Sequence, residues 1–394
     1  MSTGTGGDYW ADRALPSVFK HELLKRYLPQ FGGMTGTQSH DKRVVYLDGY
    51  AGEGRYESGE PASAEIALRV ASYFRSRDLT LECFFTEAQQ KSFDRLLAVV
   101  EQYRARGVLA HAHRGEVDGV LDSVVRRAVR EPLFLFLDPC GLALPQDRLV
   151  GVLAQQRPQK WPPTELLMNF SMMAVWRLGG HVRSPRGNER SLQRFDEVCG
   201  GTWWREYFAD AAGDSARDGA AEDAIEAVAA EYARRLAQRT SMQVQSVPVS
   251  HSPHKRAVYR LVFATRSPYG LWVFGDSVAR ARDLWWESHE VRAEDARDGQ
   301  LSFFPERPDT KEVEDKAVPV IASNLEKLLL RTRRPVKLVE HTLEVFGDFY
   351  GQVTEPVVRK AVRLLHEQGK TPSNGVGVRR TREIMLLPKE GLAA

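Results

Sequence analysis

The stretch that decides the fold is Val44-Val45-Tyr46-Leu47-Asp48-Gly49-Tyr50-Ala51-Gly52-Glu53-Gly54-Arg55-Tyr56. It begins with an apolar run, which is typical of a strand buried on both faces of a sheet. It then turns through three glycines, where the backbone can take a positive φ and a ligand can approach because no Cβ intervenes. An acidic residue at a strand end, followed by such a turn, predicts a doubly wound α/β sheet that binds an adenosyl cofactor.

The length, the composition and the cysteine count limit the classes of protein to which the chain can belong. Its 394 residues predict two or three domains, and its 42% apolar and 27% charged residues are typical of a soluble globular protein. No apolar run reaches the roughly 18–20 residues that span a bilayer, and we expect a short disordered tail over 1–11 in a cytoplasmic protein with no membrane association. The three cysteines (Cys83, Cys140 and Cys199) are widely spaced and odd in number, which argues against a disulfide framework or a metal site.

Strand and helix patterns alternate between residues 43 and 170, and this predicts a parallel sheet with right-handed crossovers. A leading amphipathic helix is expected over 12–31, and strands at 43–48, 81–87, 108–113, 132–138 and 165–170. Residues 182–238 show no strand signal and predict a helical insertion. Two further strands, at 242–249 and 257–265 with a short extension at 271–274, predict an antiparallel edge hairpin, and a helix follows over 277–288. The fold class predicted for 12–288 is therefore α/β, a class I methyltransferase-like Rossmann fold with a mostly parallel sheet.

The pattern changes after a charged, proline-containing linker predicted at 289–316. Helices are expected at 320–330, 336–346 and 354–368, followed by a turn and a hairpin strand at 378–387. This order predicts a C-terminal winged helix-turn-helix over 317–394. Residues 321–394 hold 13 Lys and Arg against 8 Asp and Glu, so the basic excess of the chain lies here.

A second acid supports a cofactor at the glycine turn. Glu87 ends the next strand, where a carboxylate can accept from both ribose hydroxyls, although it lies further from Asp48 than the roughly 20 residues of a compact dinucleotide motif. We predict that S-adenosylmethionine lies over Gly49–Gly54 with Glu87 on its ribose. The cofactor-binding residues predicted are Asp48, Gly49, Tyr50, Ala51, Gly52, Gly54, Glu87 and Asp138. A dinucleotide, or a glycine-rich turn without a ligand, is the alternative.

The fourth strand ends in Asp138-Pro139-Cys140-Gly141, at the edge where open α/β sheets bind ligands. Asp-Pro-Pro-Tyr at this place is the signature of methyltransferases that act on planar amines, which a carboxylate and a backbone carbonyl orient. Here a cysteine and a glycine replace the second proline and the aromatic ring. We predict that Asp138 and Pro139 are catalytic. The alternatives are an Asp that only ends a strand and a nucleophilic Cys140, which has no base nearby in sequence.

Three blocks of sequence resemble the three-Cys-motif partner protein family (TcmP): Ser17–Leu28, Tyr46–Tyr56 and Ser58–Ala64. Leu137–Gly141, Tyr259–Thr265 and the predicted C-terminal helix-turn-helix extend the resemblance over most of the chain. The resemblance implies a partner, the radical-SAM-like protein encoded beside members of the family. More distantly, the N-terminal blocks resemble ribosomal-RNA adenine-N6 methyltransferases of the RlmJ type, which implies an adenosylmethionine fold of nucleic-acid ancestry.

The resemblance also bears on Lys20-His21 in the leading helix. Both families carry Lys-His there, which implies that these two residues are catalytic. The alternative is a solvated charge beside a partly buried histidine.

The C-terminal segment has two competing interpretations. A basic recognition helix (Arg359, Lys360, Arg363) and a basic wing that includes Arg379 and Arg380 predict contacts with RNA or DNA phosphates. The same fold also docks proteins. We expect Trp203-Trp204 and Trp285-Trp286 to be packing residues.

Together these patterns predict a methyltransferase that uses S-adenosylmethionine and acts on an amine of a nucleic acid or another large substrate, together with a radical-SAM-like partner. The alternative is a non-catalytic protein that presents a substrate or a nucleic acid to that neighbouring enzyme.

Overall fold

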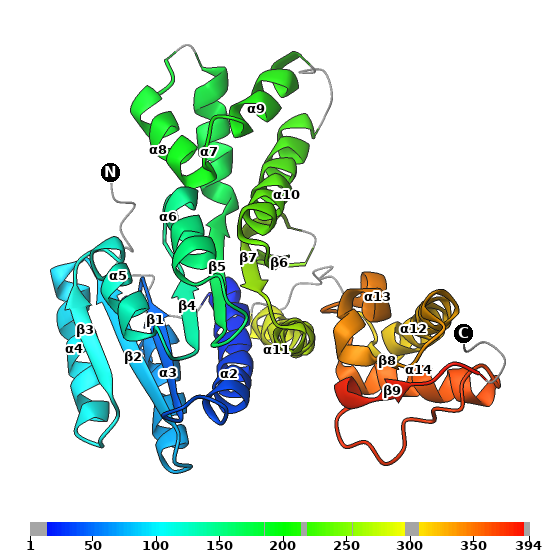
Figure 1. The fold of residues 1–394 in the computed structure, drawn as a ribbon. Helices are drawn as coiled ribbons and strands as arrows, with labels where there is room; N and C mark the ends of the chain where they lie inside the picture. The colour runs from blue at the N-terminus through cyan, green and yellow to red at the C-terminus, as the bar shows by residue number, and fades with distance from the viewer. Residues whose placement is uncertain (1–13, 185, 214–218, 254, 296–306, 390–394) are drawn as a thin grey trace. The chain divides into compact units, whose positions relative to one another are not determined.

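A computed structural model of the chain describes residues 14–184, 186–213, 219–253, 255–295 and 307–389 (Figure 1). The chain divides into two units, Met1–Arg266 and Ser267–Ala394. The tail predicted at 1–11 lies outside the described residues. The division falls earlier than the predicted end of the first domain at residue 288.

The first unit is built on a seven-stranded sheet of order β3-β2-β1-β4-β5-β7-β6 (Figure 1). Its five parallel strands come first along the chain, and β7 pairs antiparallel with both β5 and β6. This order matches the class I methyltransferase Rossmann fold, so the predicted sheet and its antiparallel edge hairpin are confirmed. The strands are β1 (Arg43–Asp48), β2 (Thr80–Glu87), β3 (Ala110–Arg114), β4 (Leu133–Leu137), β5 (Thr164–Ser171), β6 (Gln243–Ser250) and β7 (Ala257–Thr265).

The central strands are apolar throughout because both of their faces are covered. On one face, Tyr46 of β1 and Phe134 of β4 stack with centroids 6.1 Å apart, and Phe134 also meets Tyr27 and Phe31 of the first described helix at 5.7 and 5.3 Å. Residues one position along each strand point to the other face, where Val45 belongs to the larger apolar core.

Helices cover both faces, and a group of them extends the unit beyond the sheet (Figure 1). Around the sheet are α2 (Leu15–Gly36), α3 (Ser63–Arg75), α4 (Gln90–Arg104), α5 (Asp118–Arg127), α6 (Gln146–Val150) and a π-helical turn at Gly151–Gln156. The insertion contains α7 (Met172–Arg183), α8 (Glu189–Cys199), α9 (Trp204–Gly213) and α10 (Ala220–Thr240). Trp204 is fully buried there and packs edge-on against Phe195, which agrees with the packing role predicted for it.

The second unit begins with α11 (Pro268–Asp295). The strand predicted at 271–274 is therefore wrong. Trp272 lies inside this helix and is buried in the C-terminal core against Phe346, so a short apolar run belonged to a buried helix and not to a strand. This packing also explains why the division of the chain precedes α11.

Between residues 307 and 389, the described part of the chain forms three α-helices and one pair of short antiparallel strands. The elements are α12 (Thr310–Thr332), β8 (Val336–Lys337), a 3-10 turn at Leu338–His341, α13 (Thr342–Phe346), a 3-10 turn at Gly347–Phe349, α14 (Glu355–Glu367), a 3-10 turn at Thr381–Glu383 and β9 (Met385–Leu386). The linker predicted at 289–316 is helical where α11 ends and α12 begins, and 296–306 lie outside the described residues. The winged helix-turn-helix stays a prediction.

Two predicted elements of this unit are wrong in detail. The strand predicted at 378–387 is reduced to Met385–Leu386, because Thr381–Glu383 form a 3-10 turn that buries the Arg382 side chain. The helix predicted at 336–346 is divided among β8, a 3-10 turn and α13.

Candidate functional site

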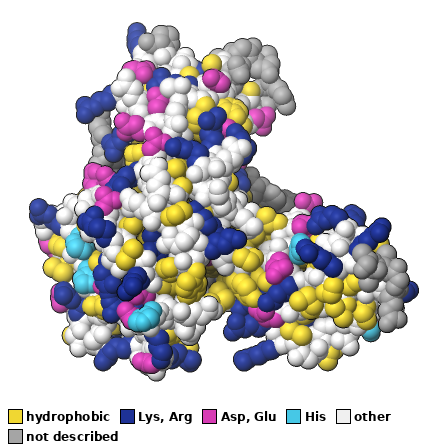
Figure 2. Space-filling view, in the orientation of Figure 1, with side chains coloured by type: hydrophobic (Ala, Val, Ile, Leu, Met, Phe, Trp, Pro, Cys, Tyr) yellow, Lys and Arg dark blue, Asp and Glu magenta, His cyan; other side chains and the backbone are white. Residues whose placement is uncertain are grey.

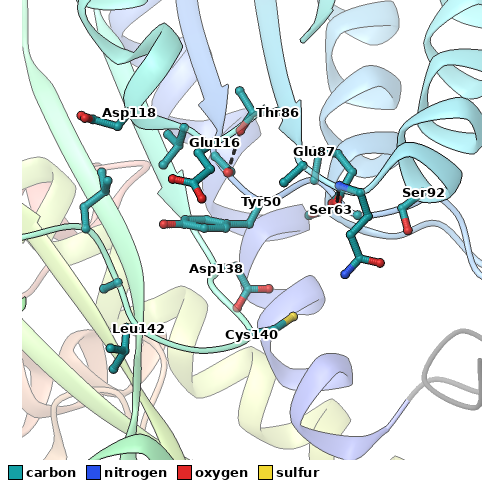
Figure 3. Close-up of a pocket in the computed structure, with 18 of the residues that line it drawn as sticks. Tyr50, Ser63, Thr86, Glu87, Ser92, Glu116, Asp118, Asp138, Cys140 and Leu142 are labelled. Carbon is teal, nitrogen blue, oxygen red and sulfur yellow. Dashed lines mark hydrogen bonds between the residues drawn. The ribbon is translucent and has the colours of Figure 1, made fainter. Parts of the chain in front are cut away.

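A cavity of about 640 Å³ opens at the carboxyl ends of β1, β2 and β4, the edge where open α/β sheets bind ligands (Figure 3). The ring of Tyr50 lies in it, between the side chains of Glu116 and Asp138. Its lining includes five acidic residues (Glu87, Glu116, Asp118, Asp138 and Glu197), two basic residues (Lys20 and Arg194) and the polar side chains of His21, Tyr50, Tyr56, Ser63, Thr86, Gln89 and Ser92.

The glycine turn forms the part of the wall that follows β1. Gly49 donates its N–H to the carbonyl of Phe136 (2.9 Å) and accepts from the Thr86 hydroxyl (2.6 Å), which fixes the turn between β4 and β2 (Figure 3). A Cβ on Gly49 would lie 2.7 Å from the Leu137 side chain, so only glycine allows this close approach. Gly52 takes φ +59°, a region open to glycine, and also lines the cavity.

Asp48 lies beneath this turn and is fully buried. Its Oδ1 accepts from the backbone N–H of Tyr50 at 3.1 Å. Burial raises the pKa of Asp48 to about 7, while the Ser63 hydroxyl and the Tyr50 N–H oppose that rise. Asp48 thus supports the turn from below and is not part of the cavity lining.

Glu87 lines the cavity from the end of β2. Its Oε1 accepts from the backbone N–H of Gln89 at 2.7 Å, and its backbone carbonyl accepts from Gly115 at 3.0 Å. The side chain is therefore oriented by its own loop. A carboxylate has about four acceptor positions, so Glu87 keeps capacity for hydroxyl donors of a ligand.

Asp138 and Lys20 form an ion pair at the cavity, although 118 positions separate them in the sequence. Lys20 is only 4% exposed, and its ammonium also lies 5.8 Å from the centroid of the Tyr259 ring. Asn169 of β5 donates from Nδ2 to the other Asp138 oxygen at 2.9 Å. The Asp138 carboxylate is thus held between a buried cation and a buried amide.

Helix α2 brings Lys20 to this position because two contacts anchor it to the sheet. The Tyr27 hydroxyl donates to Glu165 of β5 at 2.5 Å, and Thr265 of β7 donates to the same carboxylate at 2.7 Å. Tyr259 of β7 donates to the backbone carbonyl of Pro16. The helix therefore lies across β5 and β7, and the charged end of Lys20 reaches the carboxyl edge of β4.

The structure brings together most of the predicted site residues. Lys20, His21, Glu87 and Asp138 line one cavity with Gly49, Tyr50, Ala51 and Gly52. His21 is buried, with its ring centroid 5.8 Å from that of Tyr56, so neither it nor Lys20 is solvated. The remaining three predicted residues, Asp48, Gly54 and Pro139, are not in the lining; an added Cβ on Gly54 would face Leu96 of α4 at 3.2 Å.

Cys140 lies at the exposed edge of the same cavity. Desolvation and then the charge of Asp138 raise the pKa of its thiol. A raised pKa disfavours the thiolate, which is the nucleophilic form, so the geometry does not support a nucleophilic Cys140.

Sequence reasoning missed Asn169 and the contribution of α8. Asn169 is a polar residue inside the apolar run Leu166-Leu167-Met168-Asn169-Phe170, near the carboxyl end of a strand, and that position could have identified it. Arg194, Glu197 and Val198 of α8 also line the cavity. No local pattern announces them, because only the folding of the insertion brings α8 to the strand ends.

Within the described ranges there is no cluster of three or more His, Cys, Asp and Glu side chains arranged to hold a metal ion. Among the described helices, none combines the length and the apolar character that crossing a membrane requires.

No family model and no curated protein matches the chain. Similar solved structures include an O-methyltransferase from Bacillus cereus in complex with SAH (12% identity, 63% of this chain and 80% of that chain, TM-score 0.30). Another is Trm1 from Pyrococcus horikoshii with S-adenosyl-L-methionine (11% identity, 66% of this chain and 57% of that chain, TM-score 0.32). The resemblance to the TcmP family stays a prediction.

Proposed function

We propose that the first unit is a methyltransferase that uses S-adenosylmethionine and acts on an amine of a nucleic acid or another large substrate. The observation that carries this proposal is the cavity at the strand ends of a 3-2-1-4-5-7-6 sheet, with the glycine turn, Glu87 and Asp138 around it. The sheet supplies the cofactor edge, and the three features occupy three neighbouring strand ends.

The residues present fit S-adenosylmethionine. Glu87 has free acceptor positions for the ribose hydroxyls, and the turn at Gly49–Gly52 allows close approach of the cofactor. The five carboxylates of the lining suit a ligand whose sulfonium is positively charged. When bound, the cofactor supplies an electrophilic methyl group.

Asp138 is the residue that we assign to the acceptor amine. Its two oxygens each hold one donor, from Lys20 and from Asn169, and a carboxylate has about four acceptor positions. An amine can therefore donate to Asp138 without displacing either partner. Fixed orientation of a nucleophile is the main contribution that such a site makes to catalysis.

The second candidate is a non-catalytic partner that presents a substrate or a nucleic acid to a radical-SAM-like enzyme. The observation in its favour is that Lys20 already neutralises the carboxylate assigned to the acceptor. Under this proposal the cavity binds a ligand without transferring a group from it.

Calorimetry with S-adenosylmethionine tests the cofactor, and transfer of a labelled methyl group to RNA, DNA or peptide tests the reaction. We expect binding that Glu87→Gln weakens and transfer that Asp138→Asn abolishes. No heat at millimolar cofactor would refute the methyltransferase. Binding without transfer to any of the three acceptors, even with the partner present, would favour the non-catalytic candidate.

For the second unit we propose contacts with RNA or DNA phosphates. Arg363, Arg379 and Arg380 are exposed and form no ion pair with the described residues. Arg359 instead donates to the backbone carbonyls of Gly375 and Arg379, and Lys360 pairs with Glu314. Figure 2 shows Lys and Arg side chains together with an apolar area on this unit, and that mixture is also compatible with protein docking. A flat response of duplex affinity to salt would exclude phosphate contacts.

A further inference from the structure

The helical insertion carries a run of arginines, one of which lines the cavity. Between Trp176 and Arg194 the chain has one acidic residue, Glu189, and five arginines: Arg177, Arg183, Arg186, Arg190 and Arg194. All five are exposed, and none forms an ion pair with another described residue. We refer to these five residues as the arginine track.

The arginine track differs from the neighbouring helices in having no acidic ion-pair partner among the described residues. In α9 and α10, Arg205 pairs with Asp196, Arg234 and Arg235 pair with Glu231, and Arg239 pairs with Asp147. Glu189, the one acid within the track, already pairs with Arg205 at 3.0 Å. The track is thus an uncompensated positive surface, which is suited to an anionic ligand.

One end of the track is part of the cavity wall. Arg194 and Glu197 of α8 line the cavity, and Arg190 lies one helical turn before Arg194 on the same exposed face. Burial and then the charge of Glu116 raise the pKa of the Tyr50 phenol, and the charge of Arg194 opposes that rise, so this guanidinium lies near the Tyr50 ring in the cavity lining. A negative group held by Arg190 and Arg194 would therefore lie at the mouth through which an acceptor enters.

Exposed apolar side chains accompany the positive charges. Trp176 is 51% exposed and Met173 is 49% exposed, one turn apart on α7. Helix α7 begins directly after β5, three residues beyond Asn169, which donates to Asp138. The aromatic face therefore begins at the same sheet edge as the acceptor site.

We infer that the arginine track and Trp176 form a binding surface for a single-stranded nucleic acid, and that this strand presents the methyl acceptor. The second part of this inference, that the strand presents the methyl acceptor, rests on the proposed function, and the first part does not. Guanidinium groups bind phosphates in a bidentate manner, and an exposed aromatic ring stacks on unpaired bases regardless of sequence. A single strand is favoured because one base can leave the track and enter the cavity while its phosphates stay on α8.

The test uses the full chain and a fluorescent single-stranded RNA about 16 nucleotides long, with the DNA of the same sequence as a second probe. Arg190→Ala/Arg194→Ala is compared with Arg126→Ala/Arg130→Ala. Arg126 lies in the last turn of α5 and Arg130 in the turn that follows it, and both are exposed and form no ion pair with the described residues. We expect the first double variant to lose at least tenfold in affinity. Its salt slope should decrease by about 1.4, which is about 0.7 for each lost phosphate contact. The control pair should change neither quantity.

Trp176→Ala should weaken binding by about fivefold or more, and Trp176→Phe should retain most of the affinity because the ring can still stack. Polyglutamate serves as the probe for an acidic protein ligand. Equal loss in the two arginine pairs, or displacement of RNA by polyglutamate at equal charge, would overturn the inference. Calorimetry with S-adenosylmethionine separates the two proposals, since Arg190→Ala, which alters a residue outside the cavity lining, should bind the cofactor like the unaltered chain whether or not RNA binds.

Discussion

The two sides of the cavity hold their charged side chains in different ways. On the strand-end side, Asp138 is fixed by Lys20 and Asn169, and Glu87 is fixed by its own loop. On the α8 side, Arg190 and Arg194 are exposed and make no ion pair with the described residues. The strand-end side is thus organised by contacts within the chain, whereas the α8 arginines are open to a ligand. Preorganised groups serve chemistry, and open charged groups serve recruitment.

The largest expected effect follows the loss of the fixed carboxylate. Asp138→Asn should lower kcat for methyl transfer by about a thousandfold, because an oriented charge at the acceptor is removed. Asp94→Asn is the matched control, the same substitution at an exposed carboxylate of α4 outside the cavity lining. Since Asp138→Asn also leaves Lys20 buried without this partner, Lys20→Met/Asp138→Asn is measured as well. If either variant keeps normal kcat, Asp138 does not hold the acceptor.

Glu165, which anchors α2 to the sheet by accepting from Tyr27, predicts that the stability of the protein depends on pH. Burial raises the pKa of Glu165 from 4.5 to about 7, so its contribution to stability is full below pH 4.5 and is lost as pH rises through about 7. Glu165→Gln lacks this titration. We expect the free energy of unfolding of the unaltered chain to fall by about 3 kcal/mol more than that of the variant over this window. Parallel profiles in denaturant titrations would contradict the raised pKa.

A smaller effect separates the two sides directly. Glu87→Gln should weaken S-adenosylmethionine binding by about tenfold to a hundredfold, because hydrogen bonds to a charged acceptor are replaced by bonds to a neutral amide. Arg190→Ala should change that affinity by less than about twofold, since Arg190 is an exposed charge outside the cavity lining. Calorimetry measures both. If both variants lose the same affinity for S-adenosylmethionine, the strand-end side does not bind the cofactor separately from the α8 side.

The smallest effect is expected in the second unit, where part of the basic surface is already engaged internally. Arg363→Ala/Arg380→Ala should reduce duplex affinity by about tenfold and its salt slope by about 2, because two phosphate contacts are lost. Lys360→Ala should change both much less, since Lys360 pairs with Glu314. A larger effect of Lys360→Ala would mean that this ion pair opens on binding.

Much of the sheet could be predicted from the sequence. The apolar run at Val44–Leu47, the glycines after it and the polar residues at strand ends are local signals, and they identified the cavity edge in advance. The strand predicted at 271–274 failed because an apolar run of four residues does not distinguish a strand from one turn of a buried helix. The site was predicted only in part. Glu87 and Asp138 were identified because each comes at the end of a predicted strand, whereas Asn169 and the residues of α8 were missed.

The sequence by itself determined where the strands end and which acids end them, because strand burial and turn chemistry depend on neighbouring residues. Tertiary structure alone decided which charges are neutralised. Lys20 and Asp138 meet because Glu165 and Tyr259 anchor α2 to the sheet. The α8 sequence also contains acids, but Asp196 pairs with Arg205, and Arg190 and Arg194 form no ion pair with the described residues. Pairing depends on distances between residues far apart in the chain, and no local pattern contains those distances.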